Sequence, residues 1–170
     1  MPLLTVAEGM LRHLSTATST TLASLVASPT TRNPFPIADA IKQVASDRLA
    51  MAGDHLRSGD RLCQEAAYRA SISRHYYAMY HTARAVVFAE VKGDDHQRHN
   101  VLARHLPVSL PNRALREAQL TDARLLRNEA DYECYPLIEQ LWAADAQTLM
   151  ITASEFVSEL EDFALTQGLV

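Results

Sequence analysis

The C-terminal segment 137–166 carries the pattern that most constrains the fold of this chain. Large apolar side chains recur there every seven residues, with smaller or apolar ones between them: Trp142, Leu149, Phe156 and Phe163, separated by Ala146, Ala153 and Leu160. Spacings that alternate between three and four place all of them on one helical face, as in helices that pack at a shallow crossing angle. We interpret this face as a seam inside a helical bundle; a dimer interface along part of it is the alternative.

Helical periodicity extends back to Ile37. Residues 37–57 place one apolar stripe on a helix whose end is marked by Gly53 and Gly59, and Gly168 is placed as the C-cap of the last helix. No segment alternates convincingly with the period of a strand, so we predict an all-α bundle. The other expected segments are a long helix in 61–92, a polar and His-rich connection in 94–112, a helix in 113–132 and one or two joined helices in 137–166.

Residues 1–36 differ from the rest. Segment 15–31 is rich in Ser and Thr and has no charged residue, and Pro34 and Pro36 interrupt any helix that follows. We therefore expect an N-terminal arm over 1–36, loosely ordered or with a short amphipathic helix in 3–14, followed by a bundle domain over 37–170. The hydroxyl-rich composition also suits a transit peptide.

Composition narrows the functional class. Sixteen Lys and Arg against twenty Asp and Glu give a net charge of −4, so binding to nucleic acid would need a local basic cleft. No apolar run reaches about 18 residues, so we expect no membrane span. Two cysteines predict reduced thiols in a cytoplasmic protein. His96, His99 and His105 lack a Cys-x-x-Cys partner, and we predict neither a metal nor a cofactor.

The helix expected around 68–90 has two unusual faces. One is apolar and predicts the core: Tyr68, Ile72, Tyr76, Met79, Ala83, Val86 and Val87. The opposite face mixes guanidinium, imidazole and aromatic groups: Ala70, Arg74, Tyr77, His81, Arg84 and Phe88. Tyr and Arg are favoured where a contact is partly desolvated. This face is either a binding surface or a second packing face inside the bundle.

A polar strip lies on the helix expected in 113–132. Arg124, Arg127, Asn128 and Asp131 follow the spacing i, i+3, i+4, i+7 and share one face, on which Arg127 and Asp131 can pair. The strip is either a set of surface ion pairs or the border of a cleft. A guanidinium beside an amide suits phosphate or ribose oxygens.

Three pieces of sequence occur in an order that resembles the HEPN family of small prokaryotic helical proteins. They are Ser73-Arg74-His75-Tyr76-Tyr77-Ala78-Met79-Tyr80-His81, a loop with His96 after Gly93, and Leu126-Arg127-Asn128-Glu129-Ala130-Asp131-Tyr132. The resemblance covers about 37–166. It implies an up-and-down antiparallel bundle of four to five helices, a homodimer, and a groove that faces RNA or a nucleotide. Many members of the family are metal-independent ribonucleases, often toxins paired with a nucleotidyltransferase antitoxin.

One departure from the ribonuclease motif matters for function. Family nucleases have an Arg, a polar residue next to it and a His four to six residues beyond that polar residue, whereas Tyr132, four residues after Asn128, stands at the first of these positions here and no His follows. An ordinary phenol, with a pKa near 10, transfers protons poorly at neutral pH. Tyr77 or His81 from the neighbouring helix, or Tyr132 itself, would have to supply the missing acid–base group; alternatively, Tyr132 would be a site of nucleotidylation by a partner.

We therefore expect a nucleotide- or RNA-binding helical dimer from a toxin–antitoxin or defence system, with a degenerate ribonuclease motif. The alternatives are an active endoribonuclease toxin and a purely structural interaction partner. The expected catalytic residues are Arg127, Asn128, Tyr132 and His81, and the expected binding residues are Arg74, Tyr77, Arg84, Arg124, Asp131 and His96.

Overall fold

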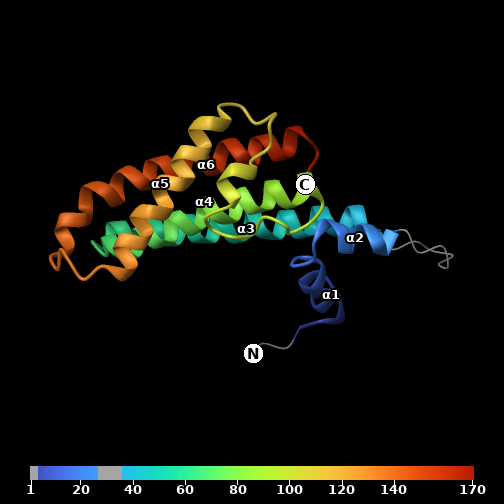
Figure 1. Ribbon diagram of the computed structural model, residues 1–170. Helices are drawn as coiled ribbons and strands as arrows, with labels where there is room; N and C mark the ends of the chain where they lie inside the picture. Colours follow the sequence, from blue (N-terminus) through green and yellow to red (C-terminus); the bar gives the residue numbers. More distant parts are fainter. Residues whose placement is uncertain (1–3, 27–35) are drawn as a thin grey trace.

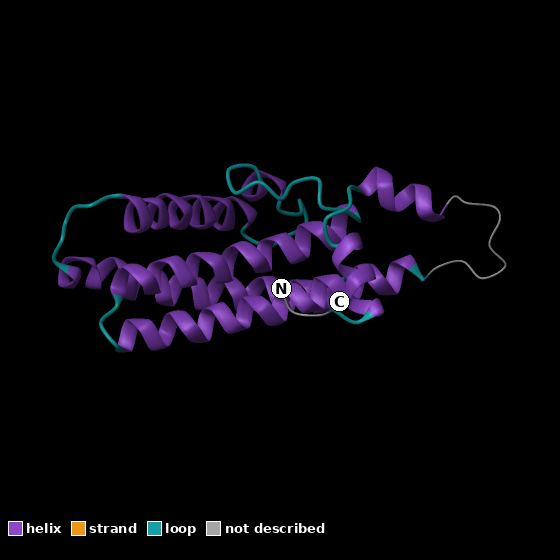
Figure 2. Cartoon of the chain, turned by 90° about the horizontal axis from the view of Figure 1, so that it is seen from below, coloured by secondary structure: helices purple, strands orange, loops and turns teal. Residues whose placement is uncertain are grey.

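The computed structural model describes residues 4–26 and 36–170, and within these ranges it contains helices and no strand (Figures 1 and 2). Four long helices alternate in direction, and two short ones precede them (Figure 1). The prediction of an all-α, up-and-down bundle is confirmed. The elements are α1 (Val6–Leu14), α2 (Ser19–Val26), α3 (Ile37–Gln64), α4 (Tyr68–Val91), α5 (Arg113–Tyr132) and α6 (Ala143–Thr166), with short 3-10 turns at Leu102–His105 and Glu139–Trp142.

The core lies where α4 packs against α3, α5 and α6. Every member of the seven-residue seam is buried, from Trp142 to Phe163, and so is the whole apolar face predicted for α4. The predicted seam is thus confirmed as an intramolecular one. Each large apolar side chain placed there contributes about 1.5–3 kcal/mol by leaving water. Gly168 follows α6 with a φ of +64°, which confirms the predicted C-cap.

The boundary between α3 and α4 differs from the prediction. Gly59 does not end a helix but lies buried inside α3, where an added Cβ would come within 2.8 Å of His75 Nε2. The missing side chain leaves room for the His75 ring, whose Nε2 lies 3.0 Å from Asp60 Oδ1. The chain turns instead after Gln64, where Ala66 has a φ of +59°. The stretch 61–92, free of Gly and Pro, is therefore divided between two helices.

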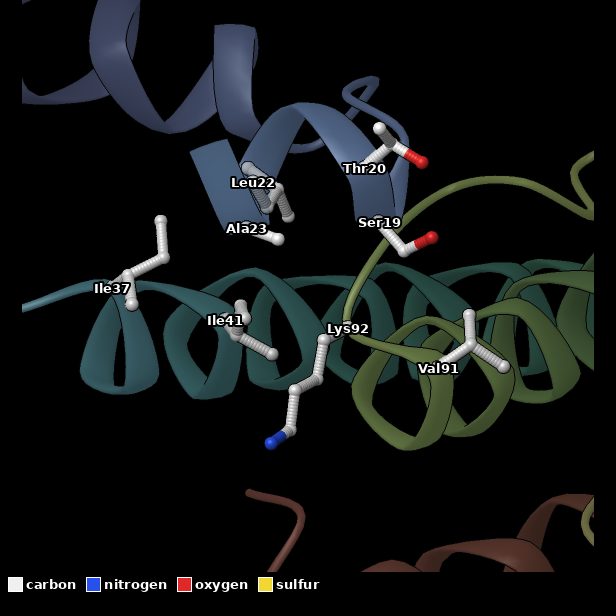
Figure 3. A pocket seen from close by; sticks show the side chains of 8 residues that line it. All are labelled: Ser19, Thr20, Leu22, Ala23, Ile37, Ile41, Val91 and Lys92. Carbon is white, nitrogen blue, oxygen red and sulfur yellow. The ribbon is translucent and has the colours of Figure 1, made fainter. Parts of the chain in front are cut away.

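The N-terminal helices are attached to the bundle by apolar and polar contacts. Leu14 and Leu22 are buried against α3 and α4, and Figure 3 shows Leu22 above Ile41. Gly93 approaches so closely that a Cβ on it would lie 2.1 Å from the Ser19 nitrogen. The Asp94 N–H donates to the Ala17 carbonyl at 2.8 Å. Part of the predicted 3–14 helix is thus present as α1, while residues 1–3 and 27–35 of the predicted arm lie outside the described residues.

Of the helices in the described ranges, none combines the length and the apolar character that crossing a membrane requires.

Candidate functional site

An open pocket of about 480 Å³ lies between α4, the loop that follows it and α5. We call it the Arg127 pocket. No acidic side chain is among its lining residues, which are Tyr76, Arg98, His99, Asn100, Arg124, Arg127, Asn128 and Tyr132. Because three guanidinium groups line one hollow, the pocket is suited to anionic ligands.

Arg127 is held in place from several sides. Its Nη2 donates to the Tyr77 hydroxyl at 2.9 Å, and its Nε lies 2.7 Å from Asp131 Oδ2, which confirms the predicted pair within α5. Its Cζ lies 5.3 Å from the ring centres of both Tyr77 and Tyr132. Burial opposes the charge, but Asp131 and Tyr77 outweigh it and raise the pKa of Arg127 above its ordinary value. The guanidinium is therefore a fixed cation before any ligand arrives.

His99 enters the same pocket from the loop between α4 and α5. Its Nδ1 lies 2.5 Å from the Tyr76 hydroxyl, and its ring stacks on Tyr80 with centres 4.1 Å apart. The Tyr80 hydroxyl donates to the Gln97 carbonyl at 2.6 Å, which fixes the loop near the imidazole. Burial, and then the charge of Arg127, lower the pKa of His99, so the ring is neutral at pH 7. His99 is not among the site residues expected from the sequence, where its spacing to His96 and His105 pointed only to a metal site.

The other predicted residues on α4 are divided among three places. Tyr77 holds Arg127 from beside the pocket, while Arg74 is exposed, with Nη1 3.5 Å from His55 Nδ1. His81 and Arg84 line a different pocket, between α1, α3 and α4. The face that looked continuous in sequence is therefore split, and Phe88 at its end is buried as a packing residue.

Arg84 belongs to a buried ionic cluster. Its Nε donates to Asp94 Oδ1 at 2.9 Å, and Arg48 Nη2 lies 3.3 Å from the same oxygen. Arg48 also donates to the Ser15 carbonyl, and its guanidinium lies over the Phe88 ring at 4.5 Å. Burial, and then the charge of Arg84, lower the pKa of Arg48 to about 10. We call the side chains of Arg48, Arg84 and Asp94 the Asp94 cluster.

The histidines of the loop do not converge. His96 stacks on His105 with centres 3.6 Å apart and does not line the Arg127 pocket, whereas His99 lies against Tyr76. Within the described ranges there is no group of three or more His, Cys, Asp or Glu side chains that could hold a metal ion. The loop histidines therefore contribute stacking, between His96 and His105, and a hydrogen bond, between His99 and Tyr76.

No protein-family profile matches the chain, and no match was found among curated proteins. The resemblance to the HEPN family therefore stays a prediction that depends on the two motifs and the loop between them.

Proposed function

We propose that this protein binds RNA or a nucleotide through phosphate groups in the Arg127 pocket. The observation that carries the proposal is the convergence of Arg98, Arg124 and Arg127 on one hollow whose lining has no acidic side chain. Two of these residues come from one face of α5 and the third from the loop after α4. Because the chain as a whole carries a net charge of −4, attraction of a polyanion would depend on this local concentration of arginine.

The chemistry of the lining favours a single-stranded or nucleotide ligand. Arginine forks match phosphate oxygens in pairs, and the Asn128 amide can bond to ribose or base edges. Tyr132 is 70% exposed at the edge of the pocket, so its ring offers a stacking surface for a base. Unstacked bases that lie on aromatic rings are typical of single-strand recognition.

The test is binding of a fluorescent single-stranded RNA, measured by anisotropy over a range of salt concentrations. Arg127→Ala is expected to weaken binding by about tenfold and to reduce the salt dependence by about one phosphate contact. Arg57→Ala is the matched control, because Arg57 is exposed on α3 and, among the residues that the structure describes, pairs with Asp54 in its own helix. Equal binding by Arg127→Ala and the unmodified protein would contradict the assignment.

The family resemblance extends this proposal to a cellular setting. We expect a cytoplasmic homodimer from a toxin–antitoxin or defence system, with a nucleotidyltransferase antitoxin as the candidate partner. The segment after α5 supports contact with another protein, since Tyr135, Leu137, Ile138 and Leu141 are all more than 60% exposed. Light scattering of the purified chain would give its mass, and a monomer at micromolar concentration would contradict the dimer.

His99 supports a second candidate, the metal-independent ribonuclease. A neutral imidazole in the Arg127 pocket can take the proton from a ribose 2′-hydroxyl, whose oxygen then attacks the phosphorus. Arg127 would stabilise the added negative charge, and the protonated His99 would return its proton to the departing 5′-oxygen. The products are a 2′,3′-cyclic phosphate and a free 5′-hydroxyl, and no water or metal is consumed.

Cleavage and binding can be separated experimentally. His99→Ala is expected to abolish cleavage of RNA in the presence of a chelator while RNA binding changes less than threefold, because the three arginines remain. An oligonucleotide with deoxyribose at the cleaved position should bind and stay intact. If the unmodified protein leaves RNA uncut under these conditions, the nuclease function is excluded. The binding function is then decided by the anisotropy measurement alone.

A further inference from the structure

A second pocket, of about 430 Å³, lies between α1, α3 and α4 and shares no lining residue with the Arg127 pocket. Its basic lining residues are Arg12 from α1, Arg48 from α3, and His81 and Arg84 from α4. From the sequence, both His81 and Arg84 are expected in the RNA site. Their position in a separate pocket leaves them free for another role, which two further observations define.

The first observation concerns hydrogen bonding. Arg48 Nη1 and His81 Nδ1 are both buried, and neither has a partner among the residues that the structure describes. Only 8% of the Arg48 side chain is exposed. Buried polar atoms are satisfied in the great majority of cases, and these two belong to side chains that line one pocket, so a single bound group is the simplest partner for both.

Two other buried nitrogens without a hydrogen bond differ from this pair. Arg127 Nε lacks hydrogen-bond geometry but lies 2.7 Å from Asp131 Oδ2, so its charge is compensated. Arg116 is paired with Glu159 through its Nη2 and donates through Nη1 to Gln119. Each of these guanidinium groups has a carboxylate of its own, whereas Arg48 shares Asp94 with Arg84.

The second observation concerns charge. The Asp94 cluster holds two guanidinium groups and one carboxylate, with side-chain exposures of 8% for Arg48, 17% for Arg84 and 1% for Asp94. A water molecule at Arg48 Nη1 would satisfy the hydrogen bond and leave the excess positive charge in place. An anion would both accept the hydrogen bond and compensate the excess positive charge. Compensation of a buried charge is strongly favourable.

We propose that this pocket binds a small oxyanion, a carboxylate or a phosphate monoester, with one oxygen accepting from Arg48 Nη1 and the anion also contacting His81 Nδ1. The mouth of the pocket limits the size and charge of the ligand. Glu8 and Asp47 line it, and both carboxylates already accept hydrogen bonds, from Thr5 and from the Gln43 amide respectively. Acidic groups at the rim disfavour polyphosphates and RNA, so the ligand carries a single anionic group.

The experiment is a titration of the full-length protein with inorganic phosphate and, separately, with acetate, at constant ionic strength. The readouts are the nitrogen resonances of the His81 ring by NMR and the melting temperature. A saturable shift at His81 with a rise in melting temperature is expected for at least one anion. If only phosphate saturates the site, the ligand is a phosphate ester. If only acetate does, the ligand is a carboxylate. If both do, the pocket is an oxyanion site of low selectivity.

Variants separate a specific site from a general salt effect. Arg48→Met is expected to weaken anion binding by about tenfold, the loss of one charged hydrogen bond. His81→Gln leaves the Asp94 cluster intact and keeps the test valid if Arg48→Met fails to fold; the expected weakening is about threefold, read from the melting temperature. Arg57→Ala should bind as the unmodified protein does. A linear response to both anions, or equal binding by His81→Gln, would overturn the proposal and leave a water-filled pocket.

Discussion

The Arg127 pocket and the Asp94 cluster lie along the same helix, α4, yet they use arginine in different ways. In the Arg127 pocket the guanidinium is fixed by a carboxylate one turn away and by two tyrosines, and the hollow beside it is open. In the Asp94 cluster two arginines surround a carboxylate whose side chain is 1% exposed. The comparison teaches that an arginine-rich face predicts neither binding nor structure by itself. Whether an arginine is available for binding or has a structural role depends on its access to water and on how many carboxylates lie beside it.

The largest expected difference between the two regions is in stability. Asp94→Asn removes the one carboxylate between Arg48 and Arg84, and we expect a loss of about 3–5 kcal/mol in the free energy of unfolding. Asp131→Asn removes the carboxylate beside Arg127, but this ion pair is partly exposed, and the expected loss is below about 1 kcal/mol. Urea unfolding measures both. Equal losses would show that the two arginine sites have the same structural role.

A smaller effect is expected on binding at the edge of the Arg127 pocket. Tyr132→Ala removes the exposed ring, and RNA affinity should fall by about fivefold, the lower end of what one stacked base contributes. Tyr132→Phe keeps the ring and should bind within twofold of the unmodified protein. Anisotropy at fixed salt distinguishes them. If Phe weakens binding as much as Ala, the hydroxyl rather than the ring carries the contact.

The smallest expected effect is a dependence of stability on pH from His81. Burial, followed by the charges of His55 and Arg84, lowers the pKa of His81 to about 4. The unfolded chain therefore binds more protons than the folded one between about pH 6.5 and 4, and the free energy of unfolding falls as the solution is acidified. We expect a loss of about 1 kcal/mol between pH 7 and 5 after allowing for the exposed part of the ring.

Urea midpoints at the two pH values, compared with those of His81→Gln, isolate this contribution. The substituted protein should lose less stability on acidification, and an unchanged pH dependence would assign the effect elsewhere. His99 in the Arg127 pocket also has a lowered pKa, because of burial and Arg127, so it contributes with the same sign. His99→Ala supplies the corresponding measurement for that region.

Much of the fold could be predicted because local spacing and burial agree in the long helices. The seam from Trp142 to Phe163 and the apolar face of α4 depend only on periodicity, and both are buried as predicted. The turn at Ala66 could not be predicted, since its left-handed backbone has no Gly or Asn to mark it. Gly59 misled for the opposite reason: its role is to accommodate His75, a contact between helices.

The site shows the same division between local and tertiary information. The alignment of Arg124, Arg127 and Asn128 follows from helical spacing, and the three side chains do line one pocket. The position of His99 depends on contacts with Tyr76 and Tyr80, which no sequence pattern in the loop reveals. The separation of His81 and Arg84 from that pocket depends on α1, α3 and the turn at Asp94, which lie elsewhere in the chain.

The close approach of Gly93 to Ser19 connects these regions mechanically. From Gly93 the chain needs only a few residues to reach His99, and along the way Asp94 is bound by Arg84 and Arg48 while the Gln97 side chain accepts from Arg84. A side chain at position 93 would collide with Ser19, so either α2 or the loop segment 93–97 would have to move. The docking of the first two helices and the position of the His99 loop therefore depend on the same short stretch of chain, 93–97, which is held on one side by Ala17 and on the other by Arg84.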